Sequence, residues 1–295
     1  MMFDVIIVGG SYAGLSAGLQ LARARRKVLV IDAGVRRNRF AATSHGFLGQ
    51  DGQPPAVIAA DGRAQLMEYP GVTWLQDSAV QAVKETGHCV VQTRHNGTFE
   101  GQRLILATGV VDELPTIEGL AERWGQRIFH CPYCHGYELD QGRIGVLATS
   151  ALAMHHALML PDWGTTTLLT NGTFEPDAAQ RAQLDRRGVK VESVAVQRIS
   201  GERADVELAD GRVLAFDGLF TQPRTHMASP LAAQLGCAFV EGPTGPYLQT
   251  GETRETSVPG VFACGDATVA GGSVAVAVGE GVRAGVGAHF SLIFS

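Results

Sequence analysis

The sequence predicts an α/β protein of two domains, each a three-layer unit with a parallel sheet and a small β-meander. Phe3–Val8 is almost wholly apolar, as a strand buried in a parallel sheet is, and glycines, a helical pattern at 14–25 and a second strand at 28–31 follow it. This order returns later in the chain, with a strand at 143–148, a helix at 150–160 and a strand at 165–170. The length of 295 residues also agrees with two domains.

The remaining elements are expected to be short strands. A hairpin with Asp210-Gly211 at its turn leads to a closing strand at 219–221 in the second domain. The glycine-rich tail from 259 onward contains no further strand-helix-strand unit, so we expect it to complete the first domain. Further strands of the first domain are expected at 72–75, 88–94 and 103–107.

Two candidate linkers set the domain boundaries. Val111–Pro115 would carry the chain out of the first domain, and the Gly/Pro-rich stretch Glu241–Pro246 would bring it back. We therefore expect a discontinuous first domain, residues 1–112 and 243–295, interrupted by a second domain, residues 113–242.

Composition excludes several classes of protein. A net charge of −5 argues against a general nucleic-acid binder, whose surface is normally basic. The sequence enters a strand at once without a secretory signal pattern, and it has no stretch of 18 apolar residues, so we expect a cytoplasmic protein without membrane contact. Five cysteines, an odd number, do not suggest a structural disulfide framework, and any disulfide would be redox-active.

The stretch Gly9-Gly10-Ser11-Tyr12-Ala13-Gly14 stands between a strand and a helix, the context of a Rossmann-like dinucleotide fingerprint. Gly9 permits a tight turn, Gly14 permits close helix–strand contact, and the helix N-terminus offers N–H groups to a pyrophosphate. Asp32 ends the second strand, where it can accept hydrogen bonds from a ribose. Ser11 replaces the middle glycine, and its side chain would either crowd the phosphates or donate to them.

The cluster His130-Cys-Pro-Tyr-Cys-His-Gly-Tyr-Glu138 admits three chemistries: a dithiol/disulfide couple, attachment of c-type haem, or zinc binding. Haem attachment needs export, for which we see no signal. Zinc needs four well-separated ligands, which adjacent residues such as His130 and Cys131 do not readily supply. No metal site is therefore expected.

Two further stretches, Ala107-Thr108-Gly109 and Val258–Asp266, resemble the paired signatures of two-dinucleotide flavoprotein disulfide reductases. This resemblance implies FAD as the dinucleotide, with Asp266 on its ribitol chain. Because flavin and a Cys-x-x-Cys pair are both two-electron carriers, it also favours the dithiol/disulfide interpretation of the cysteines. A helix beginning near Ser273 would direct its positive end at the flavin.

Along nearly its full length the chain resembles low-molecular-weight, thioredoxin-reductase-type flavoproteins. It is more similar to the branch of dithiol oxidases that close disulfides in small molecules of the gliotoxin and holomycin kind, as the stretches Cys131–Glu138, His45–Gly49 and Gly9–Gly14 indicate. The family pattern is a FAD domain interrupted by an inserted NADPH-type domain, usually as a homodimer. Where this chain has His135, ordinary thioredoxin reductases usually have aspartate.

The resemblance assigns roles to the motif residues. Cys134 would face the flavin, Cys131 would exchange with the substrate, and His135 would take and return protons near neutrality. A helix-capping or hydrogen-bonding imidazole is the alternative for His135. The residues expected to bind FAD are Gly9, Ser11, Tyr12, Ala13, Gly14, Asp32, Ala33, Arg39, His45, Thr108, Gly109, Gly265 and Asp266.

The expected nicotinamide site of the second domain lacks its fingerprint. The aligned stretch, Ala148–Ala153, has no glycine, and added Cβ atoms would obstruct a pyrophosphate. The following Leu169–Gly172 offers neither arginine for a 2′-phosphate nor an acid for a ribose. NAD(P)H binding is therefore doubtful. Electrons could run from a dithiol to oxygen or another acceptor, or a non-nicotinamide donor such as ferredoxin or a second flavin could drive reduction.

The leading hypothesis is a FAD-dependent dithiol/disulfide oxidoreductase, with a preference for the oxidase direction. The alternatives are an NADPH-dependent thioredoxin reductase and a non-catalytic flavin redox sensor or electron carrier. The partner would be a small-molecule dithiol or a thioredoxin-like protein. We interpret His155 and His156 as structural or surface residues, and the remaining cysteines as buried small hydrophobic residues: Cys89, Cys237 and Cys264.

Overall fold

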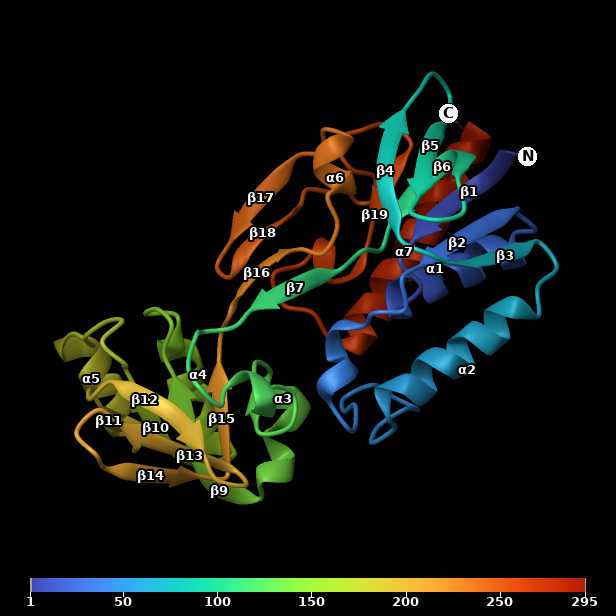
Figure 1. Cartoon of the computed structure of the whole chain (residues 1–295). Coiled ribbons are helices and arrows are strands. Elements are labelled where there is room, and N and C mark those ends of the chain that lie inside the picture. Colours follow the sequence, from blue (N-terminus) through green and yellow to red (C-terminus); the bar gives the residue numbers. More distant parts are fainter. Residues whose placement is uncertain (1, 295) are drawn as a thin grey trace. The chain divides into compact units, whose positions relative to one another are not determined.

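The computed structural model describes residues 2–294, which form two compact units (Figure 1). The first unit contains the chain up to Arg39, Phe47–Val111, and the chain from Thr225 onward. The second contains Phe40–Gly46 and Asp112–Arg224. Both carry a parallel sheet, as the repeated strand-helix-strand pattern predicted.

The sheet of the first unit has the order β3-β2-β1-β6-β5-β4, with β19 pairing β6. Pairings among β3, β2, β1, β6 and β19 are parallel, and β4, β5 and β6 form an antiparallel meander. The strands are β1 (Met2–Val8), β2 (Val28–Asp32), β3 (Val72–Gln76), β4 (Ala79–Lys84), β5 (Cys89–Thr93), β6 (Thr98–Leu106) and β19 (Val261–Ala263).

Three helices cover one face of this sheet: α1 (Tyr12–Arg23), α2 (Pro55–Met67) and α7 (Val274–Phe294) (Figure 1). Alternate residues of β1 serve the two faces: Val5 and Ile7 pack with the helices, whereas Ile6 and Val8 join the core on the other side. On that side, the short helix α6 (Leu231–Gln234) packs into the core, as does Leu248 of the hairpin β17 (Phe239–Gly242) and β18 (Gly245–Leu248).

The second unit is built on a wholly parallel sheet of order β11-β10-β9-β15-β8, joined by the meander β12-β13-β14. Its strands are β8 (Ile128–Phe129), β9 (Gln141–Leu147), β10 (Gly164–Leu169), β11 (Lys190–Glu192), β12 (Val196–Ser200), β13 (Ala204–Leu208), β14 (Val213–Phe216) and β15 (Gly218–Thr221). Its helices are α3 (Pro132–His135), α4 (Ala153–Met159) and α5 (Ala178–Arg186).

The return from the second unit to the first differs from the sequence-based expectation. The units divide after Arg224, whereas the expected boundary followed residue 242. The Gly/Pro-rich stretch that suggested a linker forms the tight turn between β17 and β18, where Gly245 adopts a φ of +142°. The segments that connect the units are instead paired strands, β7 (Val110–Glu113) and β16 (Arg224–Met227).

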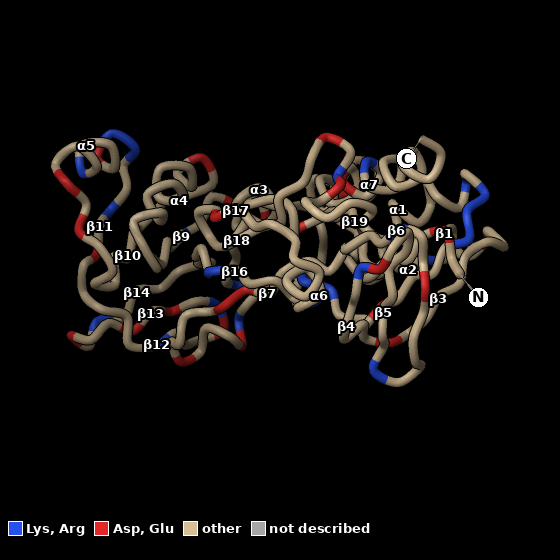
Figure 2. Tube along the Cα trace, turned by 90° about the horizontal axis from the view of Figure 1, so that it is seen from above, with Lys and Arg blue, Asp and Glu red and all other residues tan. Residues whose placement is uncertain are grey.

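Charge is distributed without a basic face. In Figure 2, Lys and Arg are interspersed with Asp and Glu in both units, apart from a short basic run after α1. No helix within residues 2–294 is long and apolar enough to cross a membrane.

The close contact between α1 and α7 depends on glycine. A Cβ atom at Gly281 would overlap the carbonyl oxygen of Ala13 in α1, whereas Gly279 faces open space. Gly281→Ala should therefore destabilise the protein by on the order of 1–3 kcal/mol, because the helices must separate. Gly279→Ala, the matched control on the same helix, should be neutral or stabilising by up to about 1 kcal/mol. Thermal unfolding of both variants tests this, and equal midpoints would contradict it.

Candidate active site and cofactor-binding site

The turn from β1 into α1 brings backbone segments closer together than side chains would allow. Gly9 has a φ of +106°, and a Cβ atom there would overlap the carbonyl oxygen of Ala107. A Cβ atom at Gly14 would overlap the carbonyl oxygen of Gly9, and one at Gly10 would lie 2.7 Å from Cγ of Asp32. The turn therefore leaves the first N–H groups of α1 open to an anionic group, as a dinucleotide pyrophosphate requires.

Asp32 and Ser11 flank this turn. Oδ1 of Asp32 accepts a hydrogen bond of 3.0 Å from the Gly10 N–H, which fixes the carboxylate at the end of β2 while Oδ2 can still accept from a ribose hydroxyl. Ser11 is the N-cap of α1, but its side chain does not cap the helix. Its hydroxyl can therefore donate to a phosphate. These residues fit a dinucleotide.

Tyr12 anchors the neighbouring segments. Its hydroxyl donates to the Pro55 carbonyl (3.0 Å) and accepts from Nδ2 of Asn38 (3.1 Å). Burial raises the pKa of Tyr12, so the phenol stays protonated. The side chain of Tyr12 thus holds the start of α2 and the turn η1 (Arg37–Phe40) against α1.

Asp266 lies in the short turn η5 (Gly265–Ala267), before the start of α7 at Val274. Gly265 has a φ of +75° and lies close to Ala13. Thr108 and Gly109 follow β6, whose carboxyl end is paired with that of β19. The structure therefore joins the glycine turn, Asp266 and the N-terminus of α7 within the first unit, from stretches more than 200 residues apart.

The sequence singled out Arg39, but the structure places a neighbouring arginine on Asp266. Nη1 of Arg37 donates to Oδ2 of Asp266 at 2.9 Å. Arg39 is exposed and donates to the carbonyl of Arg36, and Ala33 is also exposed. Three arginines stand within four positions here, so the sequence pattern alone does not reveal which of them bonds to Asp266. The assignment of Arg39 to FAD stays a prediction.

The second unit carries the cysteine pair. Cys131 and Cys134 form a disulfide with their Cα atoms 5.3 Å apart. Pro132 begins α3, whose single turn brings the two cysteines to one side, and the Cys134 N–H bonds to the Cys131 carbonyl (3.2 Å). Trp163 packs edge-on against Tyr133 and supports this turn. The motif thus forms a disulfide in this structure. Within residues 2–294, no group of three or more His, Cys, Asp or Glu side chains is arranged to hold a metal ion.

Histidines surround the disulfide motif. The ring of His135 stacks on Phe129 with centroids 4.3 Å apart. Burial, together with the smaller effects of the nearby His130 and His45, lowers the pKa of His135 to about 4. His45, which we expected in the flavin pocket, belongs to the second unit by its contacts, with Nε2 3.4 Å from Oε1 of Glu138. At neutral pH the imidazole of His135 is therefore uncharged, and its pKa lies below the near-neutral value that the sequence suggested.

The remaining cysteines and histidines agree with the structural roles predicted for them. Cys89, Cys237 and Cys264 are free and buried, and burial raises the pKa of Cys264 to about 12, so this thiol is inert. His155 is exposed on α4, whereas His156 is buried.

The loop between β9 and α4 does not fit a nicotinamide dinucleotide. Oγ1 of Thr149 donates to the Gln222 carbonyl (2.8 Å) and so bridges the carboxyl ends of β9 and β15, the switch point where α/β sheets open for ligands. The Leu152 N–H is bonded to Oγ of Ser150 (3.2 Å), and α4 begins only at Ala153. Oγ1 of Thr149 and the Leu152 N–H are thus bonded within the chain, and the loop has no glycine that would let a pyrophosphate approach its backbone.

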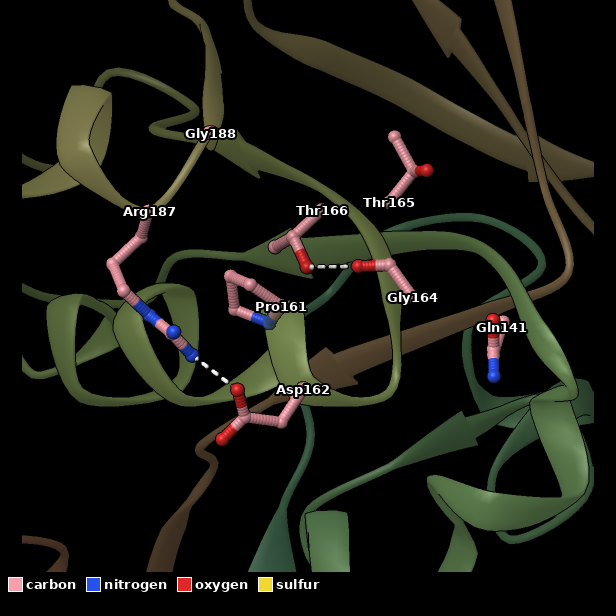
Figure 3. Close-up of a pocket in the computed structure, with 8 residues that line it drawn as sticks. All are labelled: Gln141, Pro161, Asp162, Gly164, Thr165, Thr166, Arg187 and Gly188. Carbon is pink, nitrogen blue, oxygen red and sulfur yellow. Dashed lines mark hydrogen bonds and ion pairs between the residues drawn. The ribbon is translucent and has the colours of Figure 1, made fainter.

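A hollow of about 420 Å³ opens at the amino ends of β9 and β10 (Figure 3). Its one arginine, Arg187, already donates to Oδ1 of Asp162 (2.6 Å) and to the Leu158 carbonyl (3.0 Å). Because its charge is satisfied and ligands of such sheets bind at the opposite edge, we assign it no role.

The dinucleotide cradle in one unit and the disulfide in the other define a flavin-dependent disulfide oxidoreductase. Residues 3–281 match the family model described as pyridine nucleotide-disulphide oxidoreductase. The chain belongs to this family, whose members use FAD.

Several known proteins are similar along the whole chain. Thioredoxin reductase sirT of Leptosphaeria maculans is 33% identical over 99% of this chain and 95% of its own. Thioredoxin reductase tcpT of Claviceps purpurea is 34% identical over 89% and 86%. Among solved structures, an oxidoreductase from Agrobacterium tumefaciens is 55% identical with a TM-score of 0.97, covering 100% of this chain and 99% of its own. HlmI is 35% identical with a TM-score of 0.91, covering 99% and 92%.

His156 should couple stability to pH. Its Nδ1 has no hydrogen-bond partner among the described residues, and burial lowers its pKa to about 4. The unfolded chain, with a histidine pKa of about 6.5, binds the proton first as pH falls, so stability declines between about pH 6.5 and 4. His156→Leu should reduce this decline by on the order of 1–2 kcal/mol at about pH 5.

The exposed neighbour provides the control. His155→Leu should leave the pH profile parallel to that of the wild type. Thermal midpoints measured between about pH 4.5 and 7.5 test this. A His156→Leu profile as steep as that of the wild type would contradict the assignment.

Proposed function

We propose that this FAD-dependent enzyme oxidises a dithiol to a disulfide through Cys131 and Cys134, and that it does so without a nicotinamide cofactor. The observation that carries the proposal is the combination, within one unit, of the Cys131–Cys134 disulfide beside His135 and a nucleotide loop bridged by Thr149. The disulfide supports thiol exchange, and the β9–α4 loop, where NADPH would bind, argues against NADPH as the electron donor.

The exchange balances atoms and electrons. A substrate thiolate attacks Cys131, forming a mixed disulfide and releasing the Cys134 thiolate. The second substrate thiol then attacks the substrate sulfur of the mixed disulfide, which closes the substrate disulfide and releases Cys131. The substrate loses two electrons and two protons, and the cysteine pair gains two electrons. Bound FAD supplies the two-electron acceptor that restores the disulfide.

His135 is the proton acceptor in this proposal. A dithiol must lose protons before it attacks, and a neutral imidazole beside the disulfide can take one. Because burial holds the pKa of His135 near 4, the imidazole is unprotonated across the neutral range. The FAD-side roles rest with Gly9, Ser11, Gly14, Asp32 and Asp266, as described above.

The names of the relatives favour a second candidate. Both sirT and tcpT are called thioredoxin reductases, a name that would make NADPH the donor and a thioredoxin-like protein the partner. The absence of glycine in the β9–α4 loop opposes it. Action as a homodimer is also a proposal, which the family resemblance supports.

Anaerobic titration of the purified flavoprotein separates the candidates. A small dithiol should bleach the long-wavelength flavin absorption rapidly, while an equal amount of NADPH should bleach it far more slowly, because the nucleotide loop is obstructed. The Cys131→Ser variant, in which the disulfide cannot form, is the control. It should lose the rapid bleaching by the dithiol, whereas its slow bleaching by NADPH should be unchanged, because hydride transfer to the flavin does not pass through the cysteines. Rapid bleaching by NADPH, with slow bleaching by the dithiol, would support the reductase instead.

Replacement of His135 tests the proton acceptor. His135→Gln should slow flavin reduction by a dithiol by roughly 10²-fold, the usual size of general-base catalysis. Because a pKa of about 4 leaves His135 unprotonated at both about pH 5.5 and about pH 8, this deficit should not become smaller at the lower pH. His155→Gln, on the exposed side of α4, should react at the wild-type rate. A deficit that disappears at the lower pH would overturn the assignment.

A further inference from the structure

Arg37 and Asp266 form an ion pair between distant parts of the first unit. Nη1 of Arg37, in the turn after β2, donates to Oδ2 of Asp266 in η5 at 2.9 Å. About four-fifths of each side chain is buried, with 21% of Arg37 and 22% of Asp266 exposed. A charge-assisted bond in such surroundings is stronger than one on an open surface.

The other oxygen of the Asp266 carboxylate lies against Gly272. A Cβ atom at Gly272 would overlap Oδ1 of Asp266, so a side chain there would displace the carboxylate. The turn that carries Asp266 is closed by Thr268, whose N–H and Oγ1 both bond to the Gly265 carbonyl at 2.9 Å. The bond to Arg37 and the closed turn therefore orient the Asp266 side chain, and the missing side chain at Gly272 leaves room for its carboxylate.

The backbone segment that carries Arg37 is itself held in place by hydrogen bonds. Its neighbour Asn38 donates to the hydroxyl of Tyr12, the first residue of α1, and that hydroxyl donates to the Pro55 carbonyl. The turn η1 is thereby attached to the helix whose N-terminus faces the dinucleotide. The guanidinium reaches Asp266 from a rigid base rather than from a free loop.

We infer that Arg37 is a positioning residue for the flavin, acting through Asp266. A carboxylate has about four acceptor sites, and the bond to Arg37 occupies one, so Asp266 can still accept from ribityl hydroxyl groups. A carboxylate already held in place loses less freedom when it binds, which tightens binding. This inference rests on the assignment of Asp266 to FAD but not on the direction of the dithiol reaction.

The test is a double-mutant cycle on the holoprotein, with FAD dissociation followed by the rise in flavin fluorescence after dilution. Arg37→Ala and Asp266→Asn should each release FAD roughly 10-fold faster or more, since each breaks the same charge-assisted bond. The double variant should release it no faster than Asp266→Asn alone, because Arg37 acts only through the carboxylate. Arg94→Ala, an exposed arginine of the same unit, should behave as wild type.

Three results would overturn the inference. Arg37→Ala could retain FAD like the wild type; the effects of the two substitutions could multiply, which would mean that Arg37 contacts the cofactor directly; or the loss could be confined to Arg39→Ala. If Arg37→Ala does not fold, Arg37→Lys replaces it in the cycle, with a smaller expected effect because lysine lacks the planar fork. Failure of dithiol oxidation would leave these dissociation rates unchanged, so the two proposals fail separately.

Discussion

The first unit depends on backbone-to-backbone contact at the β1–α1 turn. Gly9 lies against Ala107 after β6, Gly14 lies against Gly9, and Gly281 of α7 lies against Ala13. These contacts bring β1, α1, β6 and α7 so close together that a methyl group at any of the three glycines would overlap a neighbouring backbone atom. Because the residues predicted to bind the cofactor are on the ends of these elements, the same contacts that pack the core also set the positions of those residues.

The second unit has the same parallel framework but a different loop at the equivalent place. Between β9 and α4 there is no glycine, and the side chains of Thr149 and Ser150 bond to nearby backbone groups. The framework tolerates this change because the sheet core, with Val146 and Leu168 fully buried, does not depend on the loop. The parallel framework of this unit therefore does not require a glycine loop, and the same framework also carries the Cys131–Cys134 disulfide at α3.

Local patterns predicted much of this structure. The buried strands β1 and β2, the Asp210-Gly211 hairpin and the start of α7 near Ser273 are encoded in neighbouring residues, so their periodicity and turn chemistry reveal them. The point where the chain returns to the first unit was predicted too late in the sequence, because glycine and proline are common both in tight hairpins and in linkers. Arg37 and the location of His45 were beyond sequence reasoning, since both depend on contacts with residues far along the chain, Asp266 and Glu138.

The short excursion Phe40–Gly46 has a consequence for dissecting the molecule. These seven residues leave the first unit and join the second, so the chain passes between the units four times rather than twice. Within the second unit, Gly125 has a φ of +75° and no room for a side chain because Phe40 packs against it. A recombinant fragment cut at the two paired strands would lack these seven residues of its own unit, and the remainder would carry them without the residues that they contact.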